Sequence, residues 1–175
     1  MSEPNPITFR AITRDNLDEI LDLDVFPNQQ RHVATNARSL AQASFYSEIA
    51  WCRAIYNGDV PVGFLMTSER VGAQPYLWRF MIDYRYQGRG FGQQALSILV
   101  DRLTKSGATA LLSSCVAGKD GPLAFYQRFG FALTGEKDED GEVIISLSLA
   151  SPSGKSPRGR PPDGGGRNAP RCNPG

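Results

Sequence analysis

A hydrophobic strand pattern runs directly into a glycine-rich turn and then a helical pattern in the segment MIDYRYQGRGFGQQALSILV, residues 81–100. Gly88, Gly90 and Gly92 stand at alternate positions there, although glycine loses more backbone entropy on folding than any other residue. The first turn of a helix presents unpaired N–H groups and a partial positive charge, and glycines let an anion approach the backbone closely. The segment therefore predicts a phosphate-binding turn at the beginning of a helix.

Two common phosphate-binding loops are excluded by the spacing of these glycines. A Walker loop needs Gly-Lys-Ser/Thr at its end, whereas Gly92 is followed by two glutamines. A dinucleotide fingerprint needs Gly-x-Gly-x-x-Gly in the first strand–helix unit, with an acidic residue about 20 positions further on. The spacing here is Gly-x-Gly-x-Gly, deep in the chain. The turn belongs to another class.

The rest of the chain alternates strand and helix patterns. Strands are expected at 7–12, 49–57, 61–69, 76–83 and 108–116, with a closing hairpin at 131–149 around Asp140-Gly141. Helices are expected at 13–25 with Asp15 as N-cap, at 36–48, from the glycine turn to about Lys105, and at 121–130 from Pro122. This order predicts a single α+β domain, with a mixed sheet and helices on its faces.

Charge is distributed unevenly between the body of the chain and its end. Residues 151–175 hold five Lys or Arg side chains against Asp163, a net charge of +4, so the remaining residues carry −3 within the chain's +1. The end is rich in Pro and Gly and cannot bury enough apolar surface to offset its ordering entropy. We expect one domain over residues 1–149 and a disordered basic tail over 150–175.

The composition also excludes several functional classes. No apolar run reaches membrane-spanning length and the first residues lack the apolar core of a signal peptide, so a cytoplasmic protein without a membrane partner is expected. Its three cysteines are scattered, without a Cys-x-x-Cys pair, and His32 is the one histidine. We therefore expect reduced thiols and no metal site. The tail has no aromatic side chains to stack on bases, so no specific nucleic-acid partner is expected.

The run Arg85-x-x-Gly88-x-Gly90 resembles the [Q/R]-x-x-G-x-[G/A] motif of the GNAT acetyltransferase superfamily. Two further segments carry the resemblance. LWRFMID, at 77–83, is similar to the family strand beside the pantetheine arm of acetyl-coenzyme A, and FYQRFGF, at 125–131, is similar to the family's FYxxxGF segment, with Tyr126 in the tyrosine position. The resemblance covers about residues 7–149. Within the family, RFMID followed by YQGxGxG looks closest to the diamine and polyamine (spermine/spermidine) acetyltransferases.

This resemblance implies the GNAT fold, an α+β, three-layer arrangement in which a mixed central sheet of about seven strands is flanked by about four helices. It implies acetyl-coenzyme A as cosubstrate, no metal, and a small-molecule primary amine as acceptor, attacking directly in a ternary complex. A polyamine or diamine is the favoured acceptor, while an antibiotic, another small amine or a protein amine stays open. Homodimers are common in the family, and the oligomeric state is left open.

The resemblance also implies which residues hold the coenzyme. Backbone N–H groups near Phe80 and Met81 would polarise the thioester carbonyl. Many relatives carry Asn-x-x-Ala before the tyrosine helix, whereas this chain reads Lys119-Asp120-Gly121-Pro122, so Asp120 or backbone groups would replace the asparagine. The expected coenzyme-binding residues are Phe80, Met81, Ile82, Arg85, Gln87, Gly88, Arg89, Gly90, Phe91, Gly92 and Asp120.

The acid of the reaction is marked more clearly than the base. Tyr126 is the expected general acid, because a phenol with a pKa of ~10 holds its proton at neutral pH and can give it to a leaving thiolate. Many relatives carry a glutamate on the strand before the glycine turn, but Tyr76 and Leu77 stand there. Glu69 is the nearest candidate base, against the alternatives of a solvated hairpin charge and a water chain.

The sequence leaves two alternative functions open. A GNAT-like domain could sense acyl-coenzyme A without turnover, although the retained Tyr126 disfavours that reading. A nucleic-acid binder acting through the tail is disfavoured by the acidic body. His32 is expected to be an ordinary loop residue or to line the acceptor pocket, and Tyr46, Trp51 and Trp78 are expected to be core or pocket aromatics.

Overall fold

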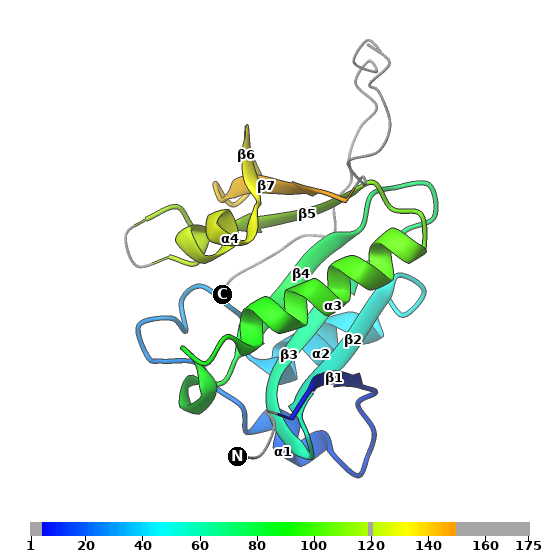
Figure 1. The fold of residues 1–175 in the computed structure, drawn as a ribbon, viewed down its shortest axis with the longest axis vertical. Coiled ribbons are helices and arrows are strands. Elements are labelled where there is room, and N and C mark those ends of the chain that lie inside the picture. The colour runs from blue at the N-terminus through cyan, green and yellow to red at the C-terminus, as the bar shows by residue number, and fades with distance from the viewer. Residues whose placement is uncertain (1–4, 119–120, 150–175) are drawn as a thin grey trace.

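The computed structural model describes residues 5–118 and 121–149. Seven strands form one sheet in the order β1-β2-β3-β4-β5-β7-β6 (Figure 1). The strands are β1 Ile7–Arg10, β2 Ala50–Asn57, β3 Val60–Ser68, β4 Tyr76–Ile82, β5 Ala110–Cys115, β6 Ala132–Lys137 and β7 Val143–Ser148. The helices are α1 Leu17–Leu21, α2 Asn36–Ser44, the short 3-10 turn η1 Tyr84–Tyr86, α3 Phe91–Lys105 and α4 Leu123–Phe129.

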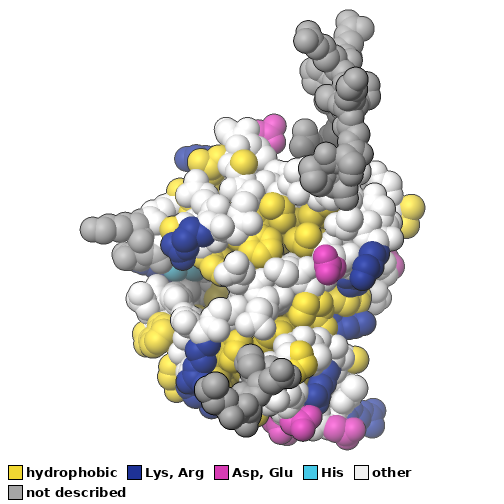
Figure 2. Space-filling model, viewed as in Figure 1, with side chains coloured by type: hydrophobic (Ala, Val, Ile, Leu, Met, Phe, Trp, Pro, Cys, Tyr) yellow, Lys and Arg dark blue, Asp and Glu magenta, His cyan; other side chains and the backbone are white. Residues whose placement is uncertain are grey.

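The sheet separates at its centre. Neighbouring strands are antiparallel except β4 and β5, which are parallel and joined by only two pairs, Tyr76 with Leu112 and Leu77 with Ser113. Beyond Leu77 and Ser113 the two strands diverge, and β5, β6 and β7 turn away from β1–β4 (Figure 1). Hydrophobic side chains are visible on this face between α3 and the β5–β7–β6 group (Figure 2). We call this divergence the β4–β5 opening.

Helices cover both faces of the sheet, which confirms the predicted three layers. On one face, Ile20 of α1 packs with Phe64, Trp78 and Met81 of the central strands. On the other face, α3 and α4 pack on β4, β5 and β7 through a cluster of buried residues: Leu77, Leu96, Leu99, Leu103, Leu111, Tyr126 and Ile145. The leucines of α3 recur at intervals of three and four residues, the periodicity that places them on one helix face.

The first helix is shorter than its sequence pattern predicts. The pattern indicates a helix over 13–25 capped by Asp15, but α1 spans Leu17–Leu21 and Asn16 is its N-cap. Leu23 and Val25 are buried without being helical, and the backbone N–H of Asp24 donates to a carboxylate oxygen of Asp83 at 3.0 Å. A tertiary hydrogen bond thus takes the place of the next helical turn.

The second helix begins at Asn36 as expected and is capped by Thr35, whose hydroxyl accepts from the backbone N–H of Arg38 at 3.3 Å. The β2–β3 hairpin turns at Gly58 and the β6–β7 hairpin at Gly141, both at positive φ, as their sequences predict. The predicted disordered tail, 150–175, lies outside the described residues. None of the helices in the described ranges is long and apolar enough to span a membrane.

Candidate active site

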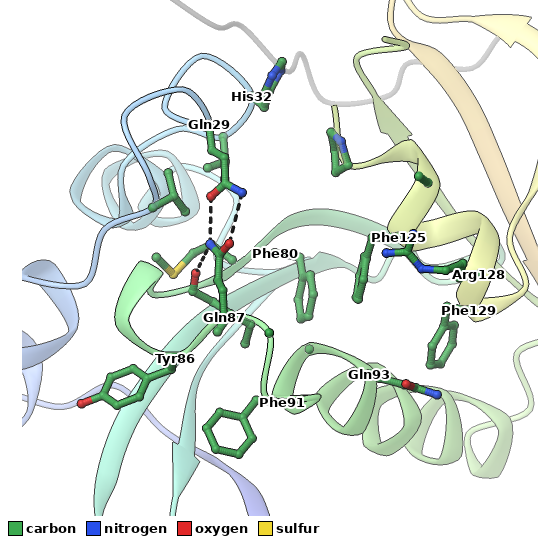
Figure 3. Close-up of a pocket in the computed structure, with 18 of the residues that line it drawn as sticks. Gln29, His32, Phe80, Tyr86, Gln87, Phe91, Gln93, Phe125, Arg128 and Phe129 are labelled. Atoms are coloured by element: carbon green, nitrogen blue, oxygen red, sulfur yellow. Dashed lines mark hydrogen bonds between the residues drawn. The ribbon is translucent and has the colours of Figure 1, made fainter. Parts of the chain in front are cut away.

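A cavity of about 590 Å³ lies where β4 ends, beside the glycine turn. Its walls come from the end of β4, the beginning of α3, α4 and the loop between α1 and α2 (Figure 3). Its lining residues are Val25, Gln29, His32, Val33, Phe80, Met81, Ile82, Tyr86, Gln87, Gly88, Gly90, Phe91, Gly92, Gln93, Gly121, Pro122, Ala124, Phe125, Arg128 and Phe129. Segments that are distant in the sequence therefore line the same cavity.

The backbone of the glycine turn forms part of the cavity wall. Gly88 has φ +75° and Gly90 has φ +79°, a left-handed conformation that side chains rarely adopt. A Cβ on Gly88 would meet nothing within 4 Å, so the space in front of it is open. Gly90 is the N-cap of α3 and makes no side-chain cap, and the unpaired N–H groups of the first helical turn follow it. This geometry suits an anion.

Gly92 serves a different purpose. A Cβ there would lie 3.2 Å from the ring of Phe125 on α4, tighter than most real Cβ contacts. The glycine therefore lets α3 and α4 approach each other at the cavity. Phe125 in turn stacks on Phe80 of β4, with ring centroids 6.1 Å apart and an interplanar angle of 14° (Figure 3). These two rings line the cavity on either side of the β4–β5 opening.

Asp83 anchors the glycine turn from behind. Its carboxylate is fully buried and accepts from the backbone N–H of Asp24 and of Arg85, and from two nitrogens of the Arg85 guanidinium at 2.8 and 3.0 Å. Burial alone would raise the pKa of Asp83, but the hydrogen bonds from Arg85 and Asp24 outweigh it and hold that pKa below its ordinary value. The turn is thus tied to the loop after α1.

Pairing with Asp83 keeps Arg85 away from the cavity lining. Arg89 does not line the cavity either, and its guanidinium donates to the Arg85 carbonyl oxygen at 3.2 Å. Gln87 does line it. The [Q/R]-x-x-G-x-[G/A] pattern can equally be read from Gln87 through Gly90 and Gly92, and this register places all three motif residues in the cavity wall.

Gln87 also connects the turn to the α1–α2 loop. Its amide exchanges two hydrogen bonds with the amide of Gln29, at 2.8 and 3.1 Å, and donates to the carbonyl oxygen of Ile82 at 2.9 Å (Figure 3). Gln29 and His32 of this loop both line the cavity. The loop is irregular in sequence, so no pattern could have predicted that it closes over the turn. Of the residues in this loop, the sequence singled out His32 as an ordinary loop residue or a lining residue of the acceptor pocket.

Eight of the predicted coenzyme-binding residues lie together in the cavity wall: Phe80, Met81, Ile82, Gln87, Gly88, Gly90, Phe91 and Gly92. Arg85 and Arg89 lie outside it, and Asp120 is not among the described residues. Sequence reasoning missed Arg128, a cation of α4 in the wall. A usable pattern existed, because Phe125 and Arg128 stand three residues apart in one helix and therefore share a face.

Tyr126 points away from this wall, into the core. It is 6% exposed and packs edge-on against Phe125 and Phe131, with ring centroids 5.4 and 5.3 Å away. Burial, together with the nearby Cys115, raises the pKa of its phenol well above the ordinary value against the opposing hydrogen bond with Ser113. Tyr126 therefore carries a proton at any working pH.

The interaction with Ser113 indicates where the Tyr126 phenol lies. Ser113 is paired with Leu77 in the last step of the β4–β5 ladder, and its hydroxyl donates to the Leu77 carbonyl oxygen at 2.9 Å. The Tyr126 hydroxyl thus lies at the apex of the β4–β5 opening. It is a protonated group held where the two strands part.

Glu69, the predicted base, does not line the cavity. Its carboxylate accepts two hydrogen bonds from Arg102, at 2.7 and 2.9 Å, and one from the Thr67 hydroxyl at 2.6 Å. Burial would raise the pKa of Glu69, but the bonds from Arg102 and Thr67 outweigh it and lower that pKa. The structure brings Glu69 neither to the cavity nor to Tyr126, and its role as base stays an untested prediction.

A β-bulge in β4 sets which side chains face the opening. Met66 pairs with Arg79 and Thr67 pairs with Leu77, so Trp78 is an extra residue on β4. Trp78 packs against Tyr46 on the α1–α2 face, at 5.5 Å between centroids, which confirms both as core aromatics. Strand alternation is reset after the bulge, and this reset turns Phe80 toward α4.

Comparison with known proteins places these features in a family. Residues 14–131 match the acetyltransferase (GNAT) family model. The chain is 32% identical over 154 residues to a spermine/spermidine N(1)-acetyltransferase of Bacillus subtilis (strain 168), covering 82% of this chain and 99% of that protein.

Solved structures agree with the fold. An acetyltransferase from Thermus thermophilus superposes with a TM-score of 0.66 at 20% identity, over 84% of this chain and 99% of that one. The PaiA N-acetyltransferase from Thermoplasma acidophilum, solved in complex with coenzyme A, superposes with a TM-score of 0.63 at 13% identity, over 81% and 98%. At these identities the likeness concerns the fold alone.

Proposed function

The chain belongs to the acetyltransferase (GNAT) family, whose members are acyltransferase enzymes, and we propose that it transfers the acetyl group of acetyl-coenzyme A to a primary amine of a polyamine or diamine. The observation that carries this proposal is the cavity at the end of β4, whose wall combines the glycine turn with the β4 residues that lie beyond the last pair with β5. We infer that the pantetheine arm runs from this cavity along the β4–β5 opening toward Tyr126.

The β4–β5 opening suits the long, thin pantetheine arm. Past Leu77, β4 keeps its ladder with β3 but has no pairs with β5. The carbonyl oxygens of Trp78 and Ile82 already accept from the side chains of Arg79 and Gln87. The other backbone N–H and C=O groups on that side of Trp78–Ile82 are available to an extended ligand, as at a sheet edge. Phe80 and Phe125 offer apolar walls to the arm where it leaves the cavity.

The cavity suits the phosphates of the coenzyme. Open space in front of Gly88 and the N-terminus of the 15-residue helix α3 meet an anion with backbone N–H groups and a partial positive charge. Arg128 adds a guanidinium from the α4 side, a donor that pairs well with phosphate oxygens. In this proposal Arg128, rather than Arg85, is the cation nearest the phosphates.

The proposed reaction is a direct transfer of the acetyl group to the amine. The neutral amine attacks the thioester carbonyl, whose oxygen accepts hydrogen bonds from the backbone N–H groups near Phe80 and Met81 as negative charge develops on it. The carbon–sulfur bond breaks as the tetrahedral intermediate collapses. Tyr126 gives its phenolic proton to the departing sulfur. Amide and free thiol leave the site.

Two observations support a polyamine as the acceptor. The Bacillus subtilis relative that is named for spermine and spermidine aligns over nearly its whole length with this chain. The body of the chain, without residues 151–175, has a net charge of −3, which attracts polycations.

The decisive experiment is an amine panel scored by release of free coenzyme A. The panel contains spermine, spermidine and putrescine, against an aminoglycoside, a lysine side-chain mimic and a peptide with a free N-terminus. Higher kcat/KM for the polyamines than for the other amines supports the proposal. Preference for another amine would reassign the acceptor. Tight acetyl-coenzyme A binding by calorimetry with no thiol release from any amine would make the protein a binding module.

A further inference from the structure

Glu142 stands beside the β4–β5 opening with a carboxylate that no other part of the proposed mechanism uses. We propose that Glu142 is the general base, which takes a proton from the ammonium of the acceptor amine; this inference rests on the proposed acetyl transfer. The sequence offered only Glu69 for this role. Position, hydrogen bonding and chemical surroundings all favour Glu142.

Position comes from the register of β5 and β7. Val143, the first residue of β7, pairs with Cys115, the last residue of β5. Glu142 directly precedes Val143, so it lies at the end of β5 where that strand has already left β4. The Ser114 hydroxyl of β5 donates to Oε2 of Glu142 at 2.9 Å. The carboxylate is thus held on the β5 wall of the opening.

The backbone of Glu142 is fixed as well. Its N–H donates to a carboxylate oxygen of Asp138 at 2.9 Å, and the N–H of Asp138 donates to the Glu142 carbonyl oxygen at 3.0 Å. Glu142 is half-buried, and within residues 5–118 and 121–149 Ser114 is the side chain that donates to its carboxylate. Among the described residues, the other carboxylate oxygen, Oε1, accepts no side-chain hydrogen bond. Glu69, in contrast, is held by both nitrogens of Arg102.

Titratable groups from its own turn, β4, β5 and α4 interact electrostatically with Glu142. Asp138 and Asp140 of its own turn, Arg79 of β4, Cys115 of β5 and Tyr126 of α4 are all close enough for electrostatic interaction with it. The proposed acid and the proposed base thus come from α4 and from the residue just before β7, two segments that both contact β5. An amine entering the opening would meet both.

The surroundings also adjust the basicity of Glu142. Burial is the main cause that raises its pKa, and Asp138 and Asp140 add to it, against the Ser114 hydrogen bond and Arg79. A carboxylate with a raised pKa accepts a proton from an ammonium more readily than an ordinary one does. Partial burial thus favours the proton transfer.

The protons balance as follows. The ammonium gives one proton to Glu142, and the resulting amine nitrogen forms its bond to the carbonyl carbon. The carbon–sulfur bond breaks, and the sulfur takes the proton of Tyr126. The nitrogen releases its second proton to solvent as the amide forms. A proton from solvent then restores the Tyr126 phenol. Glu142 releases its proton to solvent, so one proton leaves per turnover.

The test is Glu142→Gln, with Glu139→Gln as the matched control. Glutamine keeps an acceptor for Ser114 but cannot take the proton. We expect kcat with spermidine to fall roughly 10²–10⁴-fold, the usual contribution of a positioned base, with unchanged acetyl-coenzyme A affinity. Glu139 is exposed on the same turn, so its substitution removes the same charge and should leave kcat unchanged.

The pH profile distinguishes a base from a mere charge. In the wild type, kcat/KM should rise with pH through the Glu142 pKa, because the ionised carboxylate can then take the proton of the bound ammonium. Glu142→Gln should lose this inflection and rise only with deprotonation of the free amine, and Glu142→Asp, which keeps a carboxylate, should retain the inflection with partial activity. The fold is checked by melting temperature. Because the Glu142 pKa is raised in the folded state, ionised Glu142 destabilises the fold at neutral pH, and Glu142→Gln should not lower that temperature.

Two outcomes would overturn the assignment. A kcat within a few-fold of the wild type would remove Glu142 from the reaction, and a higher amine KM with unchanged kcat would make it a contact for a substrate ammonium instead. A wild-type protein that releases no thiol with any amine would refute the proposed function first, and this inference with it.

Discussion

Removal of a single oxygen atom, the hydroxyl of Tyr126, tests whether the protein is an enzyme or a coenzyme-binding module. Tyr126→Phe keeps the ring and its contacts with Phe125 and Phe131, so coenzyme affinity should be nearly unchanged. Turnover should fall roughly 10²–10⁴-fold, about 3–5 kcal/mol of barrier at ~1.4 kcal/mol per tenfold. A lost hydrogen bond alone is worth only ~1 kcal/mol. Thiol-release assays at saturating substrates measure the effect.

The raised pKa of Tyr126 adds a second expectation for the same variant. Since the phenol stays protonated across the working range, Tyr126→Phe should lower the pH profile without moving its inflections. Turnover within a few-fold of the wild type would leave Tyr126 as a core aromatic.

Asp83 is the residue whose loss should loosen the glycine turn. Asp83→Asn removes the charge that receives the Arg85 guanidinium and two backbone N–H groups, and should cost about 2 kcal/mol of unfolding free energy. The pKa of Asp83 is lowered in the folded state. Its contribution is therefore present above the unfolded-state pKa and is lost as pH falls through the folded-state value.

Urea unfolding at pH 7 and at pH 3 measures both effects of Asp83→Asn. The difference between variant and wild type should shrink at the lower pH. An equal difference at both values would show that the ionised carboxylate is not what stabilises the turn. Asp59→Asn is the matched control. The Asp59 side chain is 98% exposed in its ion pair with Arg10, and such exposed pairs contribute little to the free energy of unfolding.

At the scale of elements, the junction between β4 and α3 is where we expect the coenzyme to bind. Gly90→Val forces a branched side chain into a left-handed conformation, at about 1–2 kcal/mol, and fills space that a phosphate would occupy. We expect a folded protein with severely weakened acetyl-coenzyme A binding, measured by calorimetry.

The other end of α3 supplies the control for this variant. Gly107 has φ +89°, and a Cβ there would meet nothing within 4 Å, so Gly107→Val introduces comparable backbone strain away from the cavity. It should lower the melting temperature by a similar amount and leave coenzyme affinity intact. Equal losses of affinity in both variants would mean that strain, not the phosphate site, is responsible.

At the scale of the whole molecule, the basic tail should be dispensable. Within the described residues the last strand, β7, ends at Ser148, and the family match ends at residue 131. A chain ending at Ala150 should keep its melting temperature and its kcat with spermidine. A large loss of either, compared with the full chain in parallel assays, would show that residues 151–175 dock on the domain or contribute to its site.

Much of this architecture follows from local patterns in the sequence. Glycines at 88 and 90 favour a left-handed turn whatever surrounds them, and the leucine spacing of α3 buries one helix face. The order of strands and helices, the position of the glycine turn and the FYQRFGF segment were therefore readable. Each depends on residues within about one element of one another, where periodicity and turn chemistry carry the information.

Only the tertiary structure decided which side chains meet at the site. Asp83 captures Arg85 because the loop after α1 packs behind the turn, and Gln29 reaches Gln87 across 58 residues. Glu142 reaches Ser114 across 28 residues, through the pairing of β5 with β7. Strand register and loop packing are long-range properties, set by how whole faces bury their apolar residues. Local sequence patterns do not encode these long-range properties. The proposed acid, Tyr126, could therefore be predicted from the sequence, and the proposed base, Glu142, could not.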